Sequence, residues 1–298
     1  MNMKRPLPSG LRSFMFAPGN HPRRVAKVFA LGADVVILDL EDAVAIAEKA
    51  ATREVVVAAL QKPRQSLGYV RINSVETEWC LDDIRAVVGP WLDGIVLPKT
   101  ECAATLIKVD GWIANAERSA GLQSGRLDLV PIVETARGIE NATEIAAATP
   151  RVRRLAFGGG DYVHDLDLIW TPEEHELAYA RARLTHASRV AGLEPPIDTV
   201  VLQVKDSERF RRSARNGRGM GFQGKLCIHP DQVAACNEAF TPSAAEIEQA
   251  RAIVAAFAEA EAAGLASIQV NGQFIDYPIV YKAQRILAQA GRELEPKS

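Results

Sequence analysis

Residues 35–42 of this 298-residue chain read VVILDLED, a continuously apolar run that ends in acidic side chains. Four later runs follow the same pattern of apolar residues and then charged or polar ones: YVRIN at 69–73, IVLPKT at 95–100, VPIVET at 130–135 and RLAFGGGD at 154–161. Continuously apolar runs are typical of parallel strands that are covered on both faces. Their C-terminal ends present one set of candidate active-site residues: Asp39, Glu41, Asp42, Arg71, Lys99, Glu134 and Asp161.

Strand-like runs occur near residues 13–17, 34–40, 68–72, 94–98, 128–133, 154–158, 197–202 and 224–228, and helical stretches separate them. Eight β/α units within about 230 residues predict a closed α/β barrel of the TIM (β/α)8 type. An open Rossmann sheet is disfavoured because the G-x-G-x-x-G motif after the first strand is missing. We therefore predict a catalytic barrel domain over residues 1–240, with its chemistry at the C-terminal ends of the strands.

Residues 241–298 predict a C-terminal appendage that a barrel does not need for closure. A helix is expected from Thr241 to Ala263, because Ser243 and Glu246 form a helix-start signal and a glycine follows the helix. The turn pair Asn271-Gly272 between SIQV and QFID predicts a hairpin, and a last helix is expected over residues 278–290. We interpret this segment as a lid or as an oligomerisation element.

Composition excludes several classes of partner. A net charge of −2 provides no general attraction to nucleic acid or to an anionic membrane surface, and no apolar run is long enough to span a bilayer. The four cysteines show no C-x-x-C spacing, so neither a zinc site nor a disulfide framework is indicated. We therefore predict a cytoplasmic enzyme with a small-molecule substrate.

Glu134 and Asp161 end consecutive predicted strands, which places them side by side at the rim of the barrel. Their hard carboxylate oxygens suit Mg²⁺, or alternatively Mn²⁺, which would keep its other positions for waters and a chelating substrate. Such an ion would polarise a substrate carbonyl as a Lewis acid. The alternative is that both residues are solvated loop acids or helix caps.

Arg71 is a cation at the end of a buried strand, where a guanidinium can bind a substrate carboxylate through two parallel hydrogen bonds. An internal ion pair with Asp39, Glu41 or Asp42 is the alternative, and the two roles are compatible. Asp42 also suits a capping role for a helix that begins at Ala43.

Lys99 has two interpretations: a Schiff-base nucleophile, or a lysine paired with acids at the rim, which is the commoner arrangement. The glycine run that ends at Gly160 permits close approach of the main chain and amide donation to a carboxylate. The basic residues Arg23, Arg24 and Lys27 follow the first strand. They form either a solvated helix face or a contact for a phosphorylated cofactor.

Ten ordered blocks, from Arg12 onward, resemble the citrate lyase β-subunit/malyl-CoA lyase family of the HpcH/HpaI aldolase superfamily. Among them are DLEDAVAIAEKAATRE, VRIN, GIVLPKTE, PIVETARGIENA, FGGGDYVHDL and GFQGKLCIHPDQV. The resemblance implies a TIM barrel in which Glu134 and Asp161 hold Mg²⁺ and Arg71 holds the carboxylate of a 2-oxo acid. It also implies that Arg23, Arg24 and Lys27 contact the phosphates of coenzyme A.

The block NGQFIDYP is similar to the C-terminal block of malyl-CoA and citramalyl-CoA lyases. In those enzymes the aspartate, here Asp276, reaches the active site of an adjacent subunit. Members of the family commonly assemble as trimers or hexamers, so the resemblance implies a homotrimer or hexamer here. Tyr162 and Trp170 depart from the smaller residues of many members, which leaves the size of the acyl pocket open.

The expected function is a Mg²⁺-dependent lyase that reversibly cleaves a 3-hydroxyacyl-CoA, such as malyl-CoA or citramalyl-CoA, into acetyl-CoA or a homologue and a 2-oxo acid. Arg71, Asp276, Glu41 and Asp42 are the expected catalytic residues, and Gly160 and Lys99 are expected to contact the substrate. One alternative is a malyl-CoA thioesterase with malate-synthase-like activity. Another is a citrate lyase β-subunit that acts on a citryl thioester of an acyl carrier protein.

Overall fold

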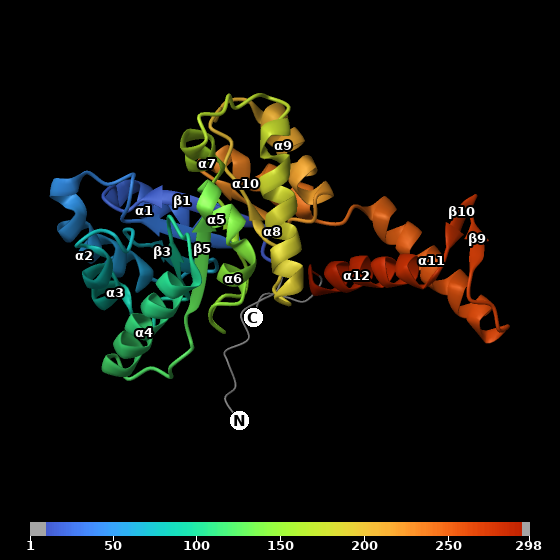
Figure 1. Cartoon of the computed structure of the whole chain (residues 1–298), viewed down its shortest axis with the longest axis horizontal. Coiled ribbons are helices and arrows are strands. Elements are labelled where there is room, and N and C mark those ends of the chain that lie inside the picture. The colour runs from blue at the N-terminus through green and yellow to red at the C-terminus, as the bar shows by residue number, and fades with distance from the viewer. Residues whose placement is uncertain (1–9, 294–298) are drawn as a thin grey trace. The chain divides into compact units, whose positions relative to one another are not determined.

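The computed structural model describes residues 10–293 of the chain, which divides into two compact units, residues 1–240 and 241–298. In the first unit, eight parallel strands close into a barrel in sequence order, and helices surround it, which confirms the predicted fold class (Figure 1). The barrel strands are β1 (Ser13–Pro18), β2 (Val35–Asp39), β3 (Leu67–Arg71), β4 (Gly94–Leu97), β5 (Asp128–Val133), β6 (Ala156–Phe157), β7 (Ile197–Asp198) and β8 (Gly224–Cys227).

Helices alternate with these strands. They are α1 (Pro22–Val28), α2 (Lys49–Leu60), α3 (Cys80–Val87), α4 (Ala103–Ser119), α5 (Ala136–Glu140), α6 (Ala142–Ala146), α7 (Gly159–Asp165), α8 (Ala178–Val190), α9 (Ser207–Gly219) and α10 (Pro230–Phe240). Two short 3-10 helices, η1 (Ile46–Glu48) and η2 (His175–Leu177), precede α2 and α8.

The apolar residues form two layers because successive side chains of a strand point to opposite faces. One cluster consists largely of alternate strand residues, such as Val35 and Ile37 of β2 and Val130 and Ile132 of β5, and fills the barrel. A larger cluster joins the other face of the strands to the helices. Both faces of the strands are therefore buried, which explains why their sequences are continuously apolar.

Closure of the barrel aligns the strand ends. β1 pairs with β8 so that Ser13 lies opposite Lys225, and with β2 so that Pro18 lies opposite Asp39. Asp39 in turn lies opposite Arg71 of β3. The charged residues that follow β2 to β6 therefore meet at one end of the barrel.

The second unit contains α11 (Ala244–Ala262), the strands β9 (Ile268–Val270) and β10 (Gln273–Ile275), and α12 (Tyr277–Glu293). The helix start predicted at Ser243 is confirmed, since Ser243 and Glu246 form a reciprocal capping box. The predicted hairpin is also confirmed: β9 and β10 pair antiparallel, and Asn271 and Gly272 both have positive φ. The two helices lie side by side around a small apolar core of their own (Figure 1).

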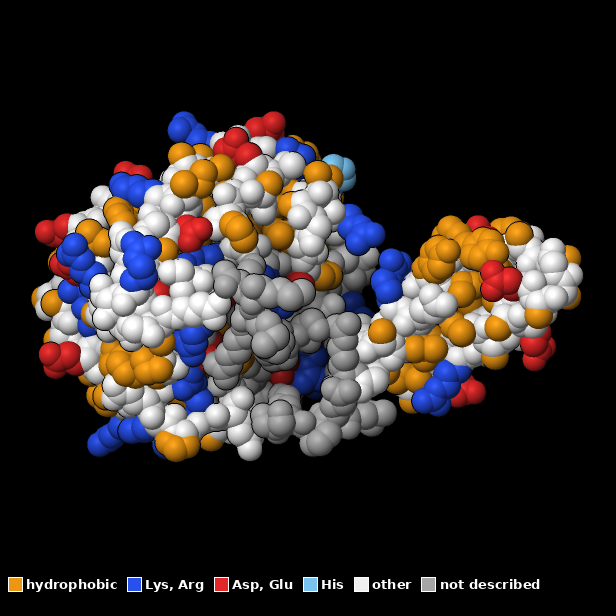
Figure 2. Space-filling model, turned by 90° about the horizontal axis from the view of Figure 1, so that it is seen from below, with side chains coloured by type: hydrophobic (Ala, Val, Ile, Leu, Met, Phe, Trp, Pro, Cys, Tyr) orange, Lys and Arg blue, Asp and Glu red, His pale blue; other side chains and the backbone are white. Residues whose placement is uncertain are grey.

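Large apolar side chains remain exposed on this second unit, where hydrophobic residues gather on the surface in Figure 2: Leu265 at 55%, Phe274 at 65% and Tyr281 at 54%. Among the described residues of the whole chain, no helix is long and apolar enough to cross a membrane.

Candidate active site

Glu134 follows the last residue of β5 and lies almost completely inside the barrel end, at 4% exposure. Its Oε1 accepts a hydrogen bond of 2.6 Å from the main-chain N–H of Lys99. Burial, and then the charge of Asp161, raises the pKa of Glu134 well above its ordinary value, and the hydrogen bond from Lys99 and the charge of Arg71 lower it less. The surrounding protein therefore leaves this carboxylate short of positive charge.

Asp161 lies in the first turn of α7, which begins directly after β6. Its charge acts on Glu134, so the two carboxylates are close enough to repel each other. Gly158 permits this arrangement, because a Cβ at that position would lie only 2.1 Å from Oε2 of Glu134. Any other residue at position 158 would displace the Glu134 carboxylate.

The donor set at this point is a pair of carboxylates. Among the described residues, no group of three or more His, Cys, Asp or Glu side chains is arranged to hold a metal ion. A pair is nevertheless sufficient for Mg²⁺, which is commonly held by one or two carboxylates and keeps waters or substrate oxygens in its other positions. The two side chains fit such an ion, because a divalent cation would offset the repulsion that raises the pKa of Glu134.

Arg71 ends β3 and is paired internally, as one of the two interpretations predicted. Its Nε and Nη2 bind the two carboxylate oxygens of Asp39 at 2.8 and 2.5 Å. Nη1 lies 2.9 Å from Oε2 of Glu41, an ion-pair contact without an aligned hydrogen bond. Although burial lowers the pKa of Arg71, the charges of Asp39 and Glu41 outweigh burial and raise the pKa. The guanidinium is thus held rigidly at the barrel mouth with N–H donors to spare, since arginine has five.

Lys99 adopts a left-handed backbone conformation, with φ of +50°. Its Nζ donates to Oε1 of Glu41 at 2.9 Å and lies 3.6 Å from Oδ1 of Asp42. Burial lowers the pKa of Lys99, but these acids outweigh it and raise the pKa. A lysine with a raised pKa stays protonated at neutral pH, so the geometry supports the paired lysine over the Schiff-base nucleophile.

Asp42 does not cap a helix at Ala43, so that prediction is wrong. Asp39 is the residue that binds the following turn, since its carboxylate accepts hydrogen bonds from the main-chain N–H groups of Glu41 and Ala43. The first helical residues come later, in η1 and α2. Asp42 is exposed on the surface of this turn.

Two further groups of predicted site residues, Gly160 and the basic residues that follow β1, lie on helices of the barrel unit. Gly160 is the second residue of α7, and a Cβ added there would meet only the Trp170 ring, at 4.0 Å, so there is room above it. The basic residues Arg23, Arg24 and Lys27 are exposed on α1, which follows the C-terminal end of β1.

Asp276 belongs to the second unit, between β10 and α12. Its Oδ1 accepts a hydrogen bond of 3.4 Å from the main-chain N–H of Ile279, so this acid caps the start of α12. The side chain is half-buried. This capping role within its own unit is compatible with a further role for the Asp276 side chain.

One buried cation near the site was not singled out from the sequence. Lys49 lies at the start of α2, and its ammonium group contacts the main chain of Leu40 and Glu41. Lys49 stands in an alternating Ala, Glu and Lys segment that is typical of a solvated helix. No sequence pattern marks a lysine whose acceptors are main-chain carbonyl groups.

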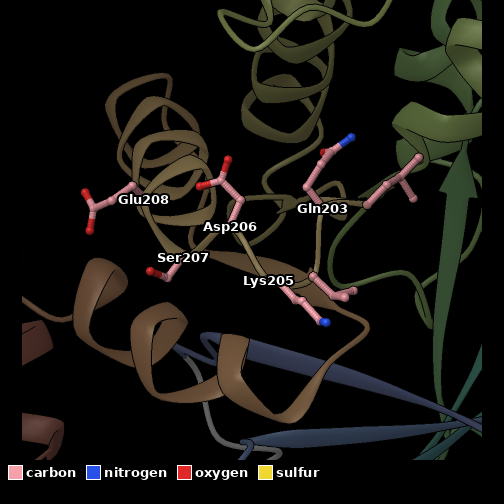
Figure 3. A pocket seen from close by; sticks show the side chains of 7 residues that line it. Gln203, Lys205, Asp206, Ser207 and Glu208 are labelled. Atoms are coloured by element: carbon pink, nitrogen blue, oxygen red, sulfur yellow. The ribbon is translucent and has the colours of Figure 1, made fainter.

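A separate open cavity of about 620 Å³ lies along the loop between β7 and α9. Figure 3 shows that Gln203, Lys205 and Asp206 line it from this single loop, and that Ser207 and Glu208 contribute from the start of α9. None of the carboxylates described above lines this cavity. The carboxylate pair is therefore a more specific candidate for chemistry than this surface hollow.

Together, the closed parallel barrel and the charged residues at the C-terminal ends of its strands place the chain among the (β/α)8-barrel enzymes. The chain belongs to the HpcH/HpaI aldolase/citrate lyase family, whose model matches residues 12–230. It is accordingly a lyase, as the resemblance found in its sequence blocks implied.

Relatives match over nearly the whole chain. Citrate lyase subunit beta of Leuconostoc mesenteroides is 38% identical, over 94% of this chain and 93% of the relative. The L-malyl-CoA/beta-methylmalyl-CoA lyase of Cereibacter sphaeroides is 34% identical, over 94% of each chain. The crystal structure of CitE from Mycobacterium tuberculosis, in complex with magnesium, acetoacetate and coenzyme A, superimposes with a TM-score of 0.77 at 30% identity, over 94% of this chain and 98% of CitE.

Proposed function

We propose that this protein is a Mg²⁺-dependent lyase that reversibly cleaves a 3-hydroxyacyl-CoA bearing a carboxylate, such as malyl-CoA or citramalyl-CoA. The products are acetyl-CoA, or a close homologue, and a 2-oxo acid. The observation that carries the proposal is the buried carboxylate of Glu134 with the charge of Asp161 acting on it, a combination that raises the pKa of Glu134 more than the Lys99 N–H and the charge of Arg71 lower it. A lyase relative that is named for malyl-CoA and a magnesium complex of CitE support it.

In this mechanism Glu134 and Asp161 hold the ion, and Arg71 binds the carboxylate of the 2-oxo acid through N–H groups that Asp39 and Glu41 leave available. A bound Mg²⁺ would supply Lewis-acid stabilisation for the charge that develops on the substrate oxygen. Asp276 exchanges a proton with the α-carbon of the thioester. In the cleavage direction, the hydroxyl gives its proton to water and the bond between C2 and C3 breaks, which leaves the carbonyl of the oxo acid and the enolate of the thioester. The α-carbon then receives a proton from Asp276, which regains one from water.

The remaining residues bind and orient the substrate. Glu41 holds Arg71 and Lys99 in place through its two carboxylate oxygens. Lys99 and the main chain at Gly160 face the oxo acid, and Asp42 contributes negative charge beside Lys99. Arg23, Arg24 and Lys27 contact the phosphates of coenzyme A from α1. All four cysteines are free, which suits the reducing cytoplasm in which we place the enzyme.

The test is an assay of the purified protein with Mg²⁺ against malyl-CoA, citramalyl-CoA and their 3-methyl relatives, with release of the 2-oxo acid as the readout. We expect cleavage of at least one of these esters, and loss of that activity in EDTA. Full activity in EDTA would contradict the metal proposal. Release of free malate from acetyl-CoA and glyoxylate would instead favour the thioesterase alternative.

The 38% identity to a citrate lyase subunit beta favours a second candidate, cleavage of a citryl thioester carried by an acyl carrier protein. The same carboxylate pair and arginine would serve that reaction. Comparing citryl-CoA with a carrier-bound citryl thioester separates the two candidates. Turnover that requires the carrier protein would support this second function.

We expect Mg²⁺ to raise the melting temperature more at about pH 8 than at about pH 5.5. The raised pKa of Glu134 means that the folded protein retains this proton above the ordinary pKa of 4.5, so folding stability is lost as pH rises through the folded pKa. Above that pKa the two carboxylates repel, and the ion relieves the repulsion. Mg²⁺ at about 100 Kd contributes about 2.7 kcal/mol, or about 5–10 °C. An equal shift at both pH values, measured by scanning fluorimetry, would contradict this prediction.

We propose that Asp276 acts in the active site of an adjacent subunit of a homotrimer or hexamer. The exposed apolar residues of the second unit, Leu265, Phe274 and Tyr281, support an interface there. Subunit mixing tests the arrangement. Glu134→Ala and Asp276→Asn are each expected to be inactive, yet co-refolded mixtures of equal parts should regain about a quarter of the activity, because one site in four then combines two intact halves. Mixtures that stay inactive would place Asp276 within its own subunit or outside the reaction.

A further inference from the structure

A buried lysine lies behind the acidic turn that follows β2. Lys49 is 7% exposed, and its Nζ donates to the main-chain oxygens of Leu40 and Glu41 at 3.0 and 2.9 Å. Its third acceptor is Oδ1 of Asn73, at 2.6 Å. An ammonium group has three donors, so these three neutral acceptors satisfy it completely. Lys49 therefore binds the main chain of the turn and does not form an ion pair there.

Asn73 ties this lysine to the end of the next strand. It lies two residues after Arg71, and its Nδ2 donates to the oxygen of Leu40 at 3.0 Å and to Oδ2 of Asp83 at 2.7 Å. Asp83 lies in α3 and is completely buried. The residues that follow β2 and β3 are thus held together by one buried polar network, with Lys49 at its centre.

The turn that Lys49 binds carries Glu41, whose carboxylate contacts both Lys99 and Arg71 at the barrel mouth. Oε1 of Glu41 accepts a hydrogen bond from Lys99, and Oε2 forms an ion-pair contact with Arg71. Its main-chain oxygen is bound by Lys49, and its main-chain N–H donates to Asp39 at 2.9 Å. The position of the Glu41 side chain therefore depends on a main chain whose oxygen is bound by Lys49 and whose N–H is bound by Asp39.

We propose that Lys49 is a positioning residue for binding of the 2-oxo acid. By fixing the main chain of Leu40 and Glu41, it keeps Glu41 between Lys99 and Arg71 and so orients the guanidinium that grips the carboxylate. This inference rests on the proposed function. A methionine would fill the same space and remove the cost of burying a charge, but it would leave the oxygens of Leu40, Glu41 and Asn73 without their donor. Lys49→Met is therefore also expected to lose stability, and the KM is the readout that tests positioning.

Lys49→Met tests the proposal. The assay runs in the condensation direction, with saturating acetyl-CoA and Mg²⁺. The KM for the oxo acid is expected to rise about tenfold, because removing a residue that orients a binding side chain commonly weakens binding by about that factor. The kcat should change much less, because the carboxylate pair and Asp276 are untouched. A general loss of folded protein would instead lower the apparent kcat and leave the KM unchanged.

Lys225→Met is the matched control. Lys225 is also a completely buried lysine, but it lies opposite Ser13 at the beginning of the barrel strands, and its Nζ contacts Asp198 at 2.6 Å. This variant should be less stable than the unsubstituted protein, with the same KM for the oxo acid. The comparison separates loss of a buried lysine from loss of this particular lysine.

A double-mutant cycle with Glu41→Gln tests whether Lys49 acts through Glu41. If it does, adding Lys49→Met to Glu41→Gln should change the KM by less than about twofold, because residues that act through one another are not additive. If Lys49→Met does not fold, Asn73→Ser is measured in its place. It removes one of the three acceptors of the ammonium and should raise the same KM to a smaller extent.

The outcomes are distinct. An active protein whose Lys49→Met variant keeps the unsubstituted KM overturns the Lys49 inference and leaves the proposed function intact. The inference is also overturned if the effects of Lys49→Met and Glu41→Gln simply multiply, or if Asn73→Ser, measured in place of a variant that does not fold, leaves the KM unchanged. An unsubstituted protein that neither cleaves nor forms any of the thioesters overturns the proposed function and, with it, the inference that rests on it.

Discussion

Glu134→Gln and Asp161→Asn should each lower Mg²⁺-dependent cleavage by about 10³-fold or more, because the ion supplies several kcal/mol of transition-state stabilisation. Glu134→Gln should nevertheless leave the protein at least as stable. The raised pKa of Glu134 shows that its charge is unfavourable in the folded protein, and a glutamine oxygen still accepts from the Lys99 N–H. The measurements are kcat/KM at saturating Mg²⁺ and the melting temperature of the metal-free protein.

Glu117→Gln provides the contrasting control. Glu117 is as buried as Glu134, but Arg151 binds both of its oxygens, at 2.9 and 2.7 Å. Burial raises the pKa of Glu117, and the hydrogen bonds from Arg151 and from the main chain outweigh burial and lower it. Its replacement should cost about 2–3 kcal/mol of stability and leave kcat/KM unchanged. If both variants lost stability and kept activity, Glu134 would be a structural residue and the metal proposal would fail.

The barrel was predictable because the continuously apolar sequence of its strands indicates that they are buried on both faces. Runs such as residues 35–39 and 128–133 are apolar at every position but one charged end, and both are strands with both faces buried. Two strands are shorter than predicted by three residues or more: residues 156–157 in place of 154–158, and residues 197–198 in place of 197–202. The apolar character of a run indicates that its side chains are buried, whereas the bounds of a strand depend on hydrogen-bonded pairing with its neighbours. Thr199, for example, turns its hydroxyl toward the main-chain N–H of Gly159.

The location of the site was also predictable, since the ends of parallel strands meet at one end of the barrel. The pairing of side chains within it was not. Arg71 had three acids within reach in sequence, and the structure pairs it with Asp39 and Glu41, while Asp42 stays exposed. That choice depends on the path of the main chain after β2, which Lys49 and Asn73 hold through carbonyl groups. Contacts to main-chain carbonyls leave no trace in residue spacing.

The largest expected effect on stability comes from a buried cluster of charges around Asp198. Asp198 ends β7 and is completely buried, and its carboxylate binds Nε of Arg181 at 2.9 Å and Nζ of Lys225 at 2.6 Å. Asp198→Asn should cost about 3–5 kcal/mol, because it leaves two buried cations without their shared anion. Urea unfolding is the measurement, with the midpoint expected to fall at an unchanged slope. A loss below about 1 kcal/mol would show that Glu174, which also binds Arg181, compensates.

The pH dependence of unfolding identifies the charge of Asp198 as the cause. Burial raises the pKa of Asp198, but the charges of Lys225 and Arg181 outweigh burial and lower it. The stabilisation is therefore complete above the unfolded pKa of about 3.9 and is lost as pH falls through the lower folded value. Asp198→Asn should remove this part of the acid-induced loss. Glu208→Gln, which breaks the exposed pair with Arg211, should change stability by less than about 0.5 kcal/mol and leave the pH profile as it is.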